Sequence, residues 1–173
     1  MIKKFLGIAL VLVQGLSFAS DRCFESSAKA YNIDANLIRA IAWQESNFRI
    51  DAKNVNKNGS TDLGVMQING IHYDRLSAMG IQQSDLASNG CLNVFVGTFI
   101  LAEIFKKHGM NWNSVGIYNA GPGTKKITTI KNRVIYASKI NEKLRAVRAA
   151  RMPSIQQPTG WLPLSMAHAP SEK

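Results

Sequence analysis

The sequence predicts a mostly α-helical domain with one small β element and one disulfide. Apolar residues recur at intervals of three and four positions over most of the chain, which is the helical spacing. The alternation typical of a strand is confined to one short run, and the chain contains two cysteines. A length of 173 residues suffices for one domain with a substantial core and an appendage.

The start of the chain has the form of a secretory signal peptide. Residues 1–4 carry two lysines, residues 5–13 are an apolar run, and Ser-Phe-Ala at 17–19 has the small-x-small form of a cleavage site. The apolar run is too short to span a bilayer. We therefore expect residues 1–19 to be a signal peptide that is removed after about Ala19.

The end of the chain differs in composition from the rest. Four of the five prolines lie at positions 153, 158, 163 and 170. A segment of this kind has little apolar surface to bury. We therefore expect residues 152–173 to be a flexible tail, and residues 20–151 to form the folded domain.

The two cysteines, Cys23 and Cys91, both lie in the part that would be exported. An even count in an oxidising compartment favours a disulfide over two free buried thiols. Cys91 follows Cys23 by 68 positions, and closing such a loop stabilises the fold by about 4 kcal/mol through lost chain entropy. The bond would join the first helix to a later one.

Six helices are expected from periodicity, caps and glycine stops. The longest apolar one should be the buried central helix, and Asn113 should cap the helix that follows it. In the last helix the apolar stripe is expected at Ile130, Val134, Ala137, Leu144 and Val147. The predicted ranges are 24–31, a helix capped by Asp34, 71–79, 93–108, 113–118 and about 128–151.

Glu45 lies on the apolar stripe of the helix that Asp34 caps. Positions 38, 41, 42 and 45 follow the i, i+3, i+4, i+7 rule. An ionised carboxylate on such a stripe is costly, so its pKa should be raised. A raised pKa suits a general acid near neutral pH. A surface glutamate at a frayed helix end fits the spacing equally well.

A second acid, Asp62, ends the polar turn Gly-Ser-Thr-Asp at 59–62. The run 62–69 reads Asp-Leu-Gly-Val-Met-Gln-Ile-Asn and is expected to form a strand, in which Gly64 marks a bend or a close approach of another chain segment. Two carboxylates on separate elements suggest acid–base chemistry on a glycosidic bond.

No metal or cofactor is expected. The histidines at 72, 108 and 168 are isolated, no Gly-x-Ser-x-Gly motif is present, and no phosphate-binding loop occurs. The run Asn54-x-Asn56-x-Asn58-Gly59 has some likeness to a calcium loop, but Val65 stands where the bidentate glutamate would be required.

The chain is basic, with a formal net charge of +10. Nine Lys/Arg residues lie between Lys125 and Arg151, opposed only by Glu142. This pattern fits a solvated helix face, or a surface that meets an anionic polymer or the cell envelope. Nucleic acid is not an expected partner for an exported protein.

Four motifs in this order resemble the small exported lytic transglycosylases that accompany conjugation, type III and type IV secretion and pilus systems. These belong to the superfamily of goose-type lysozyme and the soluble lytic transglycosylases. The resemblance spans roughly positions 23 to 144, and the cysteines also match. The motifs are Ala42-Trp43-Gln44-Glu45-Ser46-Asn47-Phe48, Gly64-Val65-Met66-Gln67-Ile68-Asn69, Tyr118-Asn119-Ala120-Gly121-Pro122-Gly123 and Arg133-Val134-Ile135-Tyr136-Ala137.

The resemblance implies a lysozyme-like fold, with a small β element beside a cleft between two lobes, and Glu45 as the single catalytic acid. It also implies a periplasmic monomer that acts on peptidoglycan glycan strands, with apparatus subunits as candidate partners. By the same matching, Ser46 holds the sugar or Glu45, the cleft is lined by Met66, Gln67 and Asn69, and the substrate is oriented by Tyr118, Asn119 and Tyr136.

The implied reaction breaks the bond between N-acetylmuramic acid and N-acetylglucosamine and leaves a 1,6-anhydro sugar. Two alternatives stay open. The stretch from Glu45 to Asn69 also resembles chicken-type lysozyme, in which an acid at the place of Asp62 supports hydrolysis with retention. Asp62 could equally cap its turn. The domain could also be a non-catalytic peptidoglycan-binding assembly factor.

Overall fold

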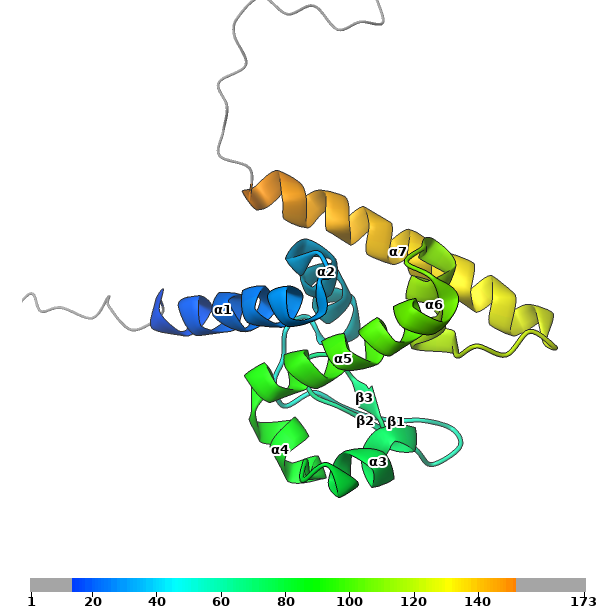
Figure 1. The fold of residues 1–173 in the computed structure, drawn as a ribbon, viewed down its shortest axis with the longest axis horizontal. Coiled ribbons are helices and arrows are strands. Elements are labelled where there is room, and N and C mark those ends of the chain that lie inside the picture. Colours follow the sequence, from blue (N-terminus) through cyan, green and yellow to red (C-terminus); the bar gives the residue numbers. More distant parts are fainter. Residues whose placement is uncertain (1–13, 152–173) are drawn as a thin grey trace, which may run out of the picture.

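The computed structural model describes residues 14–151, and side chains from residue 21 onward (Figure 1). The predicted tail and most of the predicted signal peptide lie outside these residues, so both stay predictions. The elements in order are α1 Gln14–Tyr31, α2 Ala35–Ser46, β1 Lys53–Val55, β2 Thr61–Leu63, β3 Ile68–Asn69, the 3-10 helix η1 Gly70–His72, α3 Tyr73–Ala78, α4 Gln83–Ser88, α5 Gly90–His108, α6 Trp112–Ala120 and α7 Ile127–Arg151.

The central helix is α5, as its apolar sequence predicts. Figure 1 shows it crossing the middle of the molecule, with the sheet, α3 and α4 on one side and α1, α2, α6 and α7 on the other. Both groups of elements pack on its buried side chains, among them Val94, Val96, Leu101 and Phe105. The mostly α, two-lobed architecture expected from the sequence is confirmed.

The β element is a three-stranded antiparallel sheet in the order β1-β2-β3. The single strand expected at 62–69 is therefore wrong: β2 and β3 are two short strands that pair Asp62 with Asn69. Gly64 and Gln67 turn the chain between them, with φ of 74° and 49°. A Cβ at Gly64 would lie 2.6 Å from the Leu86 carbonyl oxygen, so the predicted bend and the predicted close approach both hold.

Helix α4 was not expected from periodicity, because six residues are too few to show it. The signal that was available is Asp85 in the first turn, whose carboxylate accepts from the Gln82 backbone N–H at 2.8 Å at the N-terminus of the helix. The cap of α6 was also misplaced by two positions. Asn111, not Asn113, accepts from the backbone N–H of Ser114 at 3.0 Å.

Helix α7 buries only part of the predicted stripe: Ala137 and Leu144 face inward as expected, but the first two turns do not follow the prediction. Ile130 and Val134 are 37% and 66% exposed, whereas Arg133 and Tyr136 are almost fully buried. The Arg133 side chain donates to the carbonyl oxygens of Gly121 and Gly123, at 2.9 and 2.6 Å. These bonds satisfy the buried guanidinium, which is why a charged position can face inward where an apolar one was expected.

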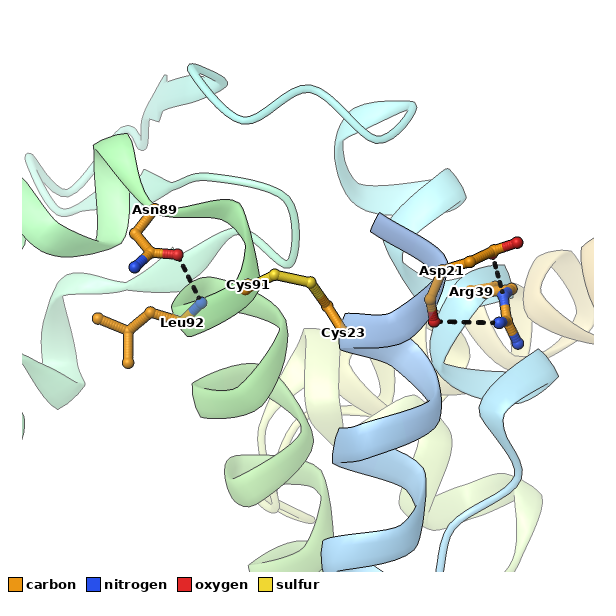
Figure 2. Close-up of a disulfide and its surroundings, with 6 residues drawn as sticks. All are labelled: Asp21, Cys23, Arg39, Asn89, Cys91 and Leu92. Atoms are coloured by element: carbon orange, nitrogen blue, oxygen red, sulfur yellow. Dashed lines mark hydrogen bonds and ion pairs between the residues drawn. A yellow bond between two sulfur atoms is a disulfide. The ribbon is translucent and has the colours of Figure 1, made fainter. Parts of the chain in front are cut away.

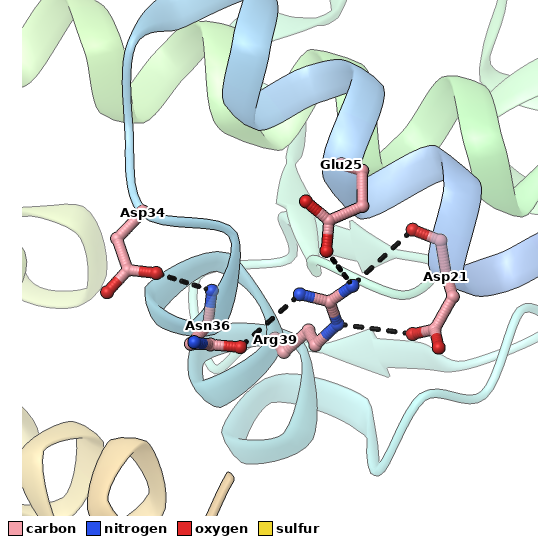
Figure 3. A network of polar contacts seen from close by, with 5 residues as sticks. All are labelled: Asp21, Glu25, Asp34, Asn36 and Arg39. Carbon is pink, nitrogen blue, oxygen red and sulfur yellow. Dashed lines mark hydrogen bonds and ion pairs between the residues drawn. The ribbon is translucent and has the colours of Figure 1, made fainter. Parts of the chain in front are cut away.

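Two cross-links fix α1 to the rest of the domain. The predicted disulfide joins Cys23 of α1 to Cys91 in the first turn of α5 (Figure 2). Arg39 of α2 reaches α1 through ion pairs with Asp21 at 3.2 Å and Glu25 at 2.7 Å (Figure 3). Arg39 is only 4% exposed, so its buried positive charge needs both carboxylates as partners.

Between residues 14 and 151, no helix combines the length and apolar character needed to cross a membrane.

Removing the disulfide should destabilise the domain without changing its architecture. We expect Cys23→Ser/Cys91→Ser to lower the free energy of unfolding by about 2–4 kcal/mol, because the unfolded chain regains the entropy of a 68-residue loop. Urea titration followed by circular dichroism measures the loss. Wild-type protein kept in a reducing agent is the control and should show the same loss. A loss below ~0.5 kcal/mol in both would contradict the role given to the bond.

Candidate active site

Glu45 occupies the last turn of α2. Asp34 caps the helix as predicted, accepting from the backbone N–H of Asn36 at 2.8 Å, and Asn47 ends it in the left-handed conformation. Ile38 and Ile41 on the same stripe are completely buried. Glu45 therefore stands where the apolar stripe of α2 leaves the core and meets the surface cleft.

The Glu45 carboxyl group accepts a hydrogen bond from the Tyr136 hydroxyl of α7. Burial raises the pKa of Glu45 from 4.5 to about 7, the Tyr136 hydrogen bond lowers it, and the charge of Asp62 raises it. The raised pKa expected from the stripe is thus present. At neutral pH a large share of Glu45 carries a proton that it can donate.

Two tyrosines, Tyr118 of α6 and Tyr136 of α7, are affected by the charge of this carboxyl group. The hydroxyl of Tyr118 donates to the Met66 carbonyl oxygen at 2.9 Å, while that of Tyr136 donates to Glu45. Burial, followed by the negative charge of Glu45, holds the pKa of both tyrosines well above 10.0. Both therefore stay neutral hydrogen-bond donors at any working pH.

Asp62 of β2 is held by three side-chain amides. Its Oδ2 accepts from Asn54 at 3.1 Å and from Asn56 at 3.0 Å, and its Oδ1 accepts from Asn69 at 2.6 Å. Asn54 and Asn56 are two positions apart near the end of β1, so their side chains reach the same side of the sheet. The amides fix the orientation of the carboxylate.

Glu45 and Asp62 face one cleft of about 870 Å³ between the two lobes. Of the other predicted residues, Gln67, Asn69, Tyr118 and Asn119 also line this cleft. The remaining walls come from the β1–β2 loop, α3, α5 and the end of α6, and include Lys57, His72, Arg75, Ile100, Glu103, Lys107 and Ile117. Glu103 and Arg75 form an ion pair at 2.8 Å, which joins α5 to α3 within the cleft wall.

Two predicted contact residues have other positions. Met66 is completely buried and its side chain is part of the core, not of the cleft wall. Ser46 is 6% exposed, and its hydroxyl donates to the Val65 carbonyl oxygen at 2.8 Å. It thus holds the β2–β3 turn against α2 rather than a sugar or the carboxyl group of Glu45.

Asn93 of α5 supports the site and was not singled out from the sequence. Its side chain is completely buried and bonds three backbone groups: it donates to the carbonyls of Leu63 and Leu86, both at 2.9 Å, and accepts from Met66 N–H at 2.7 Å. An asparagine inside an apolar helix pattern was the available signal, because a buried amide needs partners.

The asparagine run at 54–58 orients Asp62 and the turn that precedes it. Residues 14–151 contain no cluster of three or more His, Cys, Asp or Glu side chains that could hold a metal ion. Asn54 and Asn56 instead donate to Asp62, and Asn58 accepts from the Ser60 hydroxyl at 2.8 Å.

Comparisons with known proteins agree with this geometry. The profile of the "Transglycosylase SLT domain" family matches residues 22–139. The chain is 34% identical to "X polypeptide" of Escherichia coli over 169 residues, covering 98% of both chains. It is 40% identical to "Invasion protein IagB" of Salmonella typhi over 141 residues, with 82% of this chain and 86% of the relative covered. For "Protein IpgF" of Shigella flexneri, the identity is 39% over 146 residues, with coverage of 84% and 93%.

A solved structure shows the same fold. It is an inactive mutant of the lytic transglycosylase Slt from Pseudomonas aeruginosa, matched with a TM-score of 0.59 at 22% identity. The match covers 75% of this chain but only 24% of that longer one. The lysozyme-like fold expected from the sequence is therefore confirmed.

The raised pKa of Glu45 predicts a pH-dependent effect of Glu45→Gln on stability. Between pH 4.5 and about 7 the unfolded chain ionises while the folded protein keeps its proton, so wild-type stability falls as the pH rises. The neutral glutamine does not incur this loss. At pH 8 the variant should be more stable than wild type by on the order of 3 kcal/mol, and at pH 4 the difference should vanish.

Thermal and urea unfolding at pH 4, 6 and 8 measure this effect. Glu142→Gln, at an exposed position of α7, is the matched control and should show no such gain. Equal stability of wild type and Glu45→Gln at pH 8 would count against the raised pKa.

Proposed function

This chain belongs to the SLT transglycosylase family and is a peptidoglycan lytic transglycosylase, and from that premise we propose that Glu45 is its single acid–base catalyst. The observation that carries the proposal is the environment of this one side chain. It is partly buried at the edge of the cleft, has a pKa of about 7, and is the only acid of α2. These are the properties of a general acid that works near neutral pH.

In the first step, Glu45 protonates the glycosidic oxygen between N-acetylmuramic acid and N-acetylglucosamine, and the bond to the muramic C1 breaks. The acetamido group of the muramic residue stabilises the positive charge that develops at C1. Glu45 is then a carboxylate in a partly buried position. The Tyr136 hydroxyl donates to it and stabilises this charged form.

In the second step, the Glu45 carboxylate removes the proton of the muramic C6 hydroxyl, and the C6 oxygen bonds to C1. The product is a 1,6-anhydro sugar, Glu45 regains its proton, and no water is consumed. One carboxyl group serves as acid and then as base, which requires a pKa near the working pH in both directions.

Asp62 is proposed as an electrostatic partner of this reaction. Its carboxylate lines the same cleft and is oriented by three amides, so it can stabilise positive charge at the sugar without moving. The same pair of carboxylates supports a second candidate function. A hydrolase of the retaining type would use Asp62 as nucleophile and consume one water.

A purely structural peptidoglycan-binding factor is the remaining candidate. A protein that only binds peptidoglycan does not require an acid such as Glu45, whose pKa is raised by burial and whose hydrogen-bond partner is the buried Tyr136. This arrangement costs folding stability at neutral pH, and catalysis is the property that benefits from it.

The proposed biological role is to open the cell wall locally for an envelope-spanning secretion, conjugation or pilus apparatus from the periplasm. Support comes from relatives of nearly the same length, one of which is named an invasion protein. The net charge of +10 suits a protein that meets anionic polymers of the envelope.

Glu45→Gln tests the catalyst directly. Purified peptidoglycan is digested with wild type or variant, and the products are analysed by mass spectrometry. Wild type should release fragments ending in 1,6-anhydro-muramic acid, and the variant should lose at least ~10³-fold in rate while staying folded, because the proton donor is gone. Full activity of the variant would overturn the assignment.

Asp62→Asn tests the electrostatic partner. We expect kcat to fall roughly 10- to 100-fold, and the alkaline limb of the kcat profile to move to lower pH, because the Asp62 charge raises the pKa of Glu45. Asp51→Asn, at an exposed position outside the cleft, is the control. An unchanged rate and pH profile would assign Asp62 a structural role only.

The products of the wild type distinguish the two candidate reactions. Wild-type products one water heavier than the anhydro sugars would favour the hydrolase.

A further inference from the structure

An apolar groove lies away from the active site and is larger than the catalytic cleft. Its volume is about 930 Å³, compared with about 870 Å³ for the cleft, and the two share no lining residue. Its walls come from α1, from α2 and the residues after it, from the start of α5 and from the C-terminal end of α7. We call it the disulfide groove, because Cys23 and Cys91 both line it (Figure 2).

The disulfide groove presents apolar and aromatic surface to solvent. Phe48 and Ile50 are 43% and 49% exposed, and exposed apolar clusters of this kind mark interaction sites. Phe48 packs edge-to-face on Phe24 with ring centroids 6.1 Å apart, and its φ of 64° is rare for an aromatic residue. The charged residues of the wall, Asp21 and Arg39, pair with each other at 3.2 Å. The groove therefore suits an uncharged, apolar ligand.

Helix α7 brings the next segment of the chain to this groove. Val147 and Ala150 of its last turns line the wall, and Arg151 is the last residue that the structure describes. The predicted tail carries no Asp, Glu, Lys or Arg from 152 to 171 and contains one apolar run, Trp-Leu-Pro-Leu-Ser-Met at 161–166. Ten positions separate Arg151 from Trp161, and ten extended residues span up to about 35 Å, so the run can return to the groove.

The apolar run and the groove are complementary in chemistry. Proline-containing segments favour extended conformations and bind grooves that are lined by aromatic side chains. Pro158 and Pro163 lie before and within the run, and Phe24, Trp43 and Phe48 line the groove. The covalent link to α7 keeps the run near the groove at an effective concentration of about 1 mM, which favours the protein's own tail over a second copy.

We propose that residues 161–166 bind in the disulfide groove of the same molecule. Bound there, the run covers Phe48 and Ile50 and ties the end of α7 to α1 and α2. Trp43 of the groove wall lies two positions before Glu45, so the run supports the helix that carries the acid from outside the cleft. The predicted tail is then a stabilising part of the domain, and this holds whatever reaction the cleft performs.

Photo-crosslinking of the full chain from residue 20 tests the contact. Trp161→p-benzoyl-phenylalanine places a probe in the run, and mass spectrometry should locate its link on a groove residue of the same molecule. Val147→Arg puts a charge into the groove and should lower the yield of this link at least ~10-fold. Val134→Arg, at an exposed position of the same helix outside the groove, is the matched control and should leave the yield unchanged.

Thermal unfolding provides a second measurement, with changes confined to the tail. Trp161→Ala/Leu164→Ala should lower Tm by about 3–6 °C, because the apolar contact between the run and the groove is lost. Ile155→Ala, an apolar position of the tail outside the run, is the control and should change Tm by less than about 1 °C.

Three results would overturn the proposal. A link that forms only between two molecules would make a second copy the occupant of the groove. An absent link, or links without preference for the groove, would leave the run unbound. A double variant with the Tm of wild type would show that the run adds no stability. None of these results bears on the role of Glu45, because cleavage is not the quantity measured.

Discussion

The site depends on one short turn, residues 64–67 between β2 and β3, whose backbone is held by three helices. Ser46 of α2 donates to the Val65 carbonyl, Asn93 of α5 accepts from Met66 N–H, and Tyr118 of α6 donates to the Met66 carbonyl. Each contact satisfies a backbone group that burial would otherwise leave unpaired. The turn thereby fixes both strands that carry Asp62 and Asn69 opposite Glu45, although those residues come from different lobes.

The two carboxylates of the cleft show how environment divides their roles. Glu45 is partly buried and accepts one phenol hydrogen bond, and desolvation is the larger effect and raises its pKa to about 7. Asp62 accepts hydrogen bonds from the amides of Asn54, Asn56 and Asn69, which hold its carboxylate in one orientation. An acid that keeps its proton and a fixed negative charge are the two components that cleavage of a sugar bond needs.

Much of this could be predicted from the sequence because local rules produced it. The Asp34 cap, the apolar stripe ending at Glu45, the central helix and the disulfide all follow from spacing or residue type. The resemblance identified the site residues, but not which of their atoms face the cleft. Ser46 and Met66 match the family motifs, yet their places are set by tertiary contacts that no spacing shows. The inward face of the first turns of α7 was missed for the same reason, since Arg133 is buried there only because it donates to two glycine carbonyls.

Helix α7 links the acid to the loop after α6. Gly116 of α6 lets α7 approach so closely that a Cβ there would lie 2.6 Å from the Arg133 carbonyl oxygen, and Arg133 in turn holds the loop after α6. The same helix places the Tyr136 hydroxyl on Glu45. Any shift of α7 would therefore change the hydrogen bond that lowers the pKa of the acid. The geometry of catalysis thus depends on one helix–helix contact.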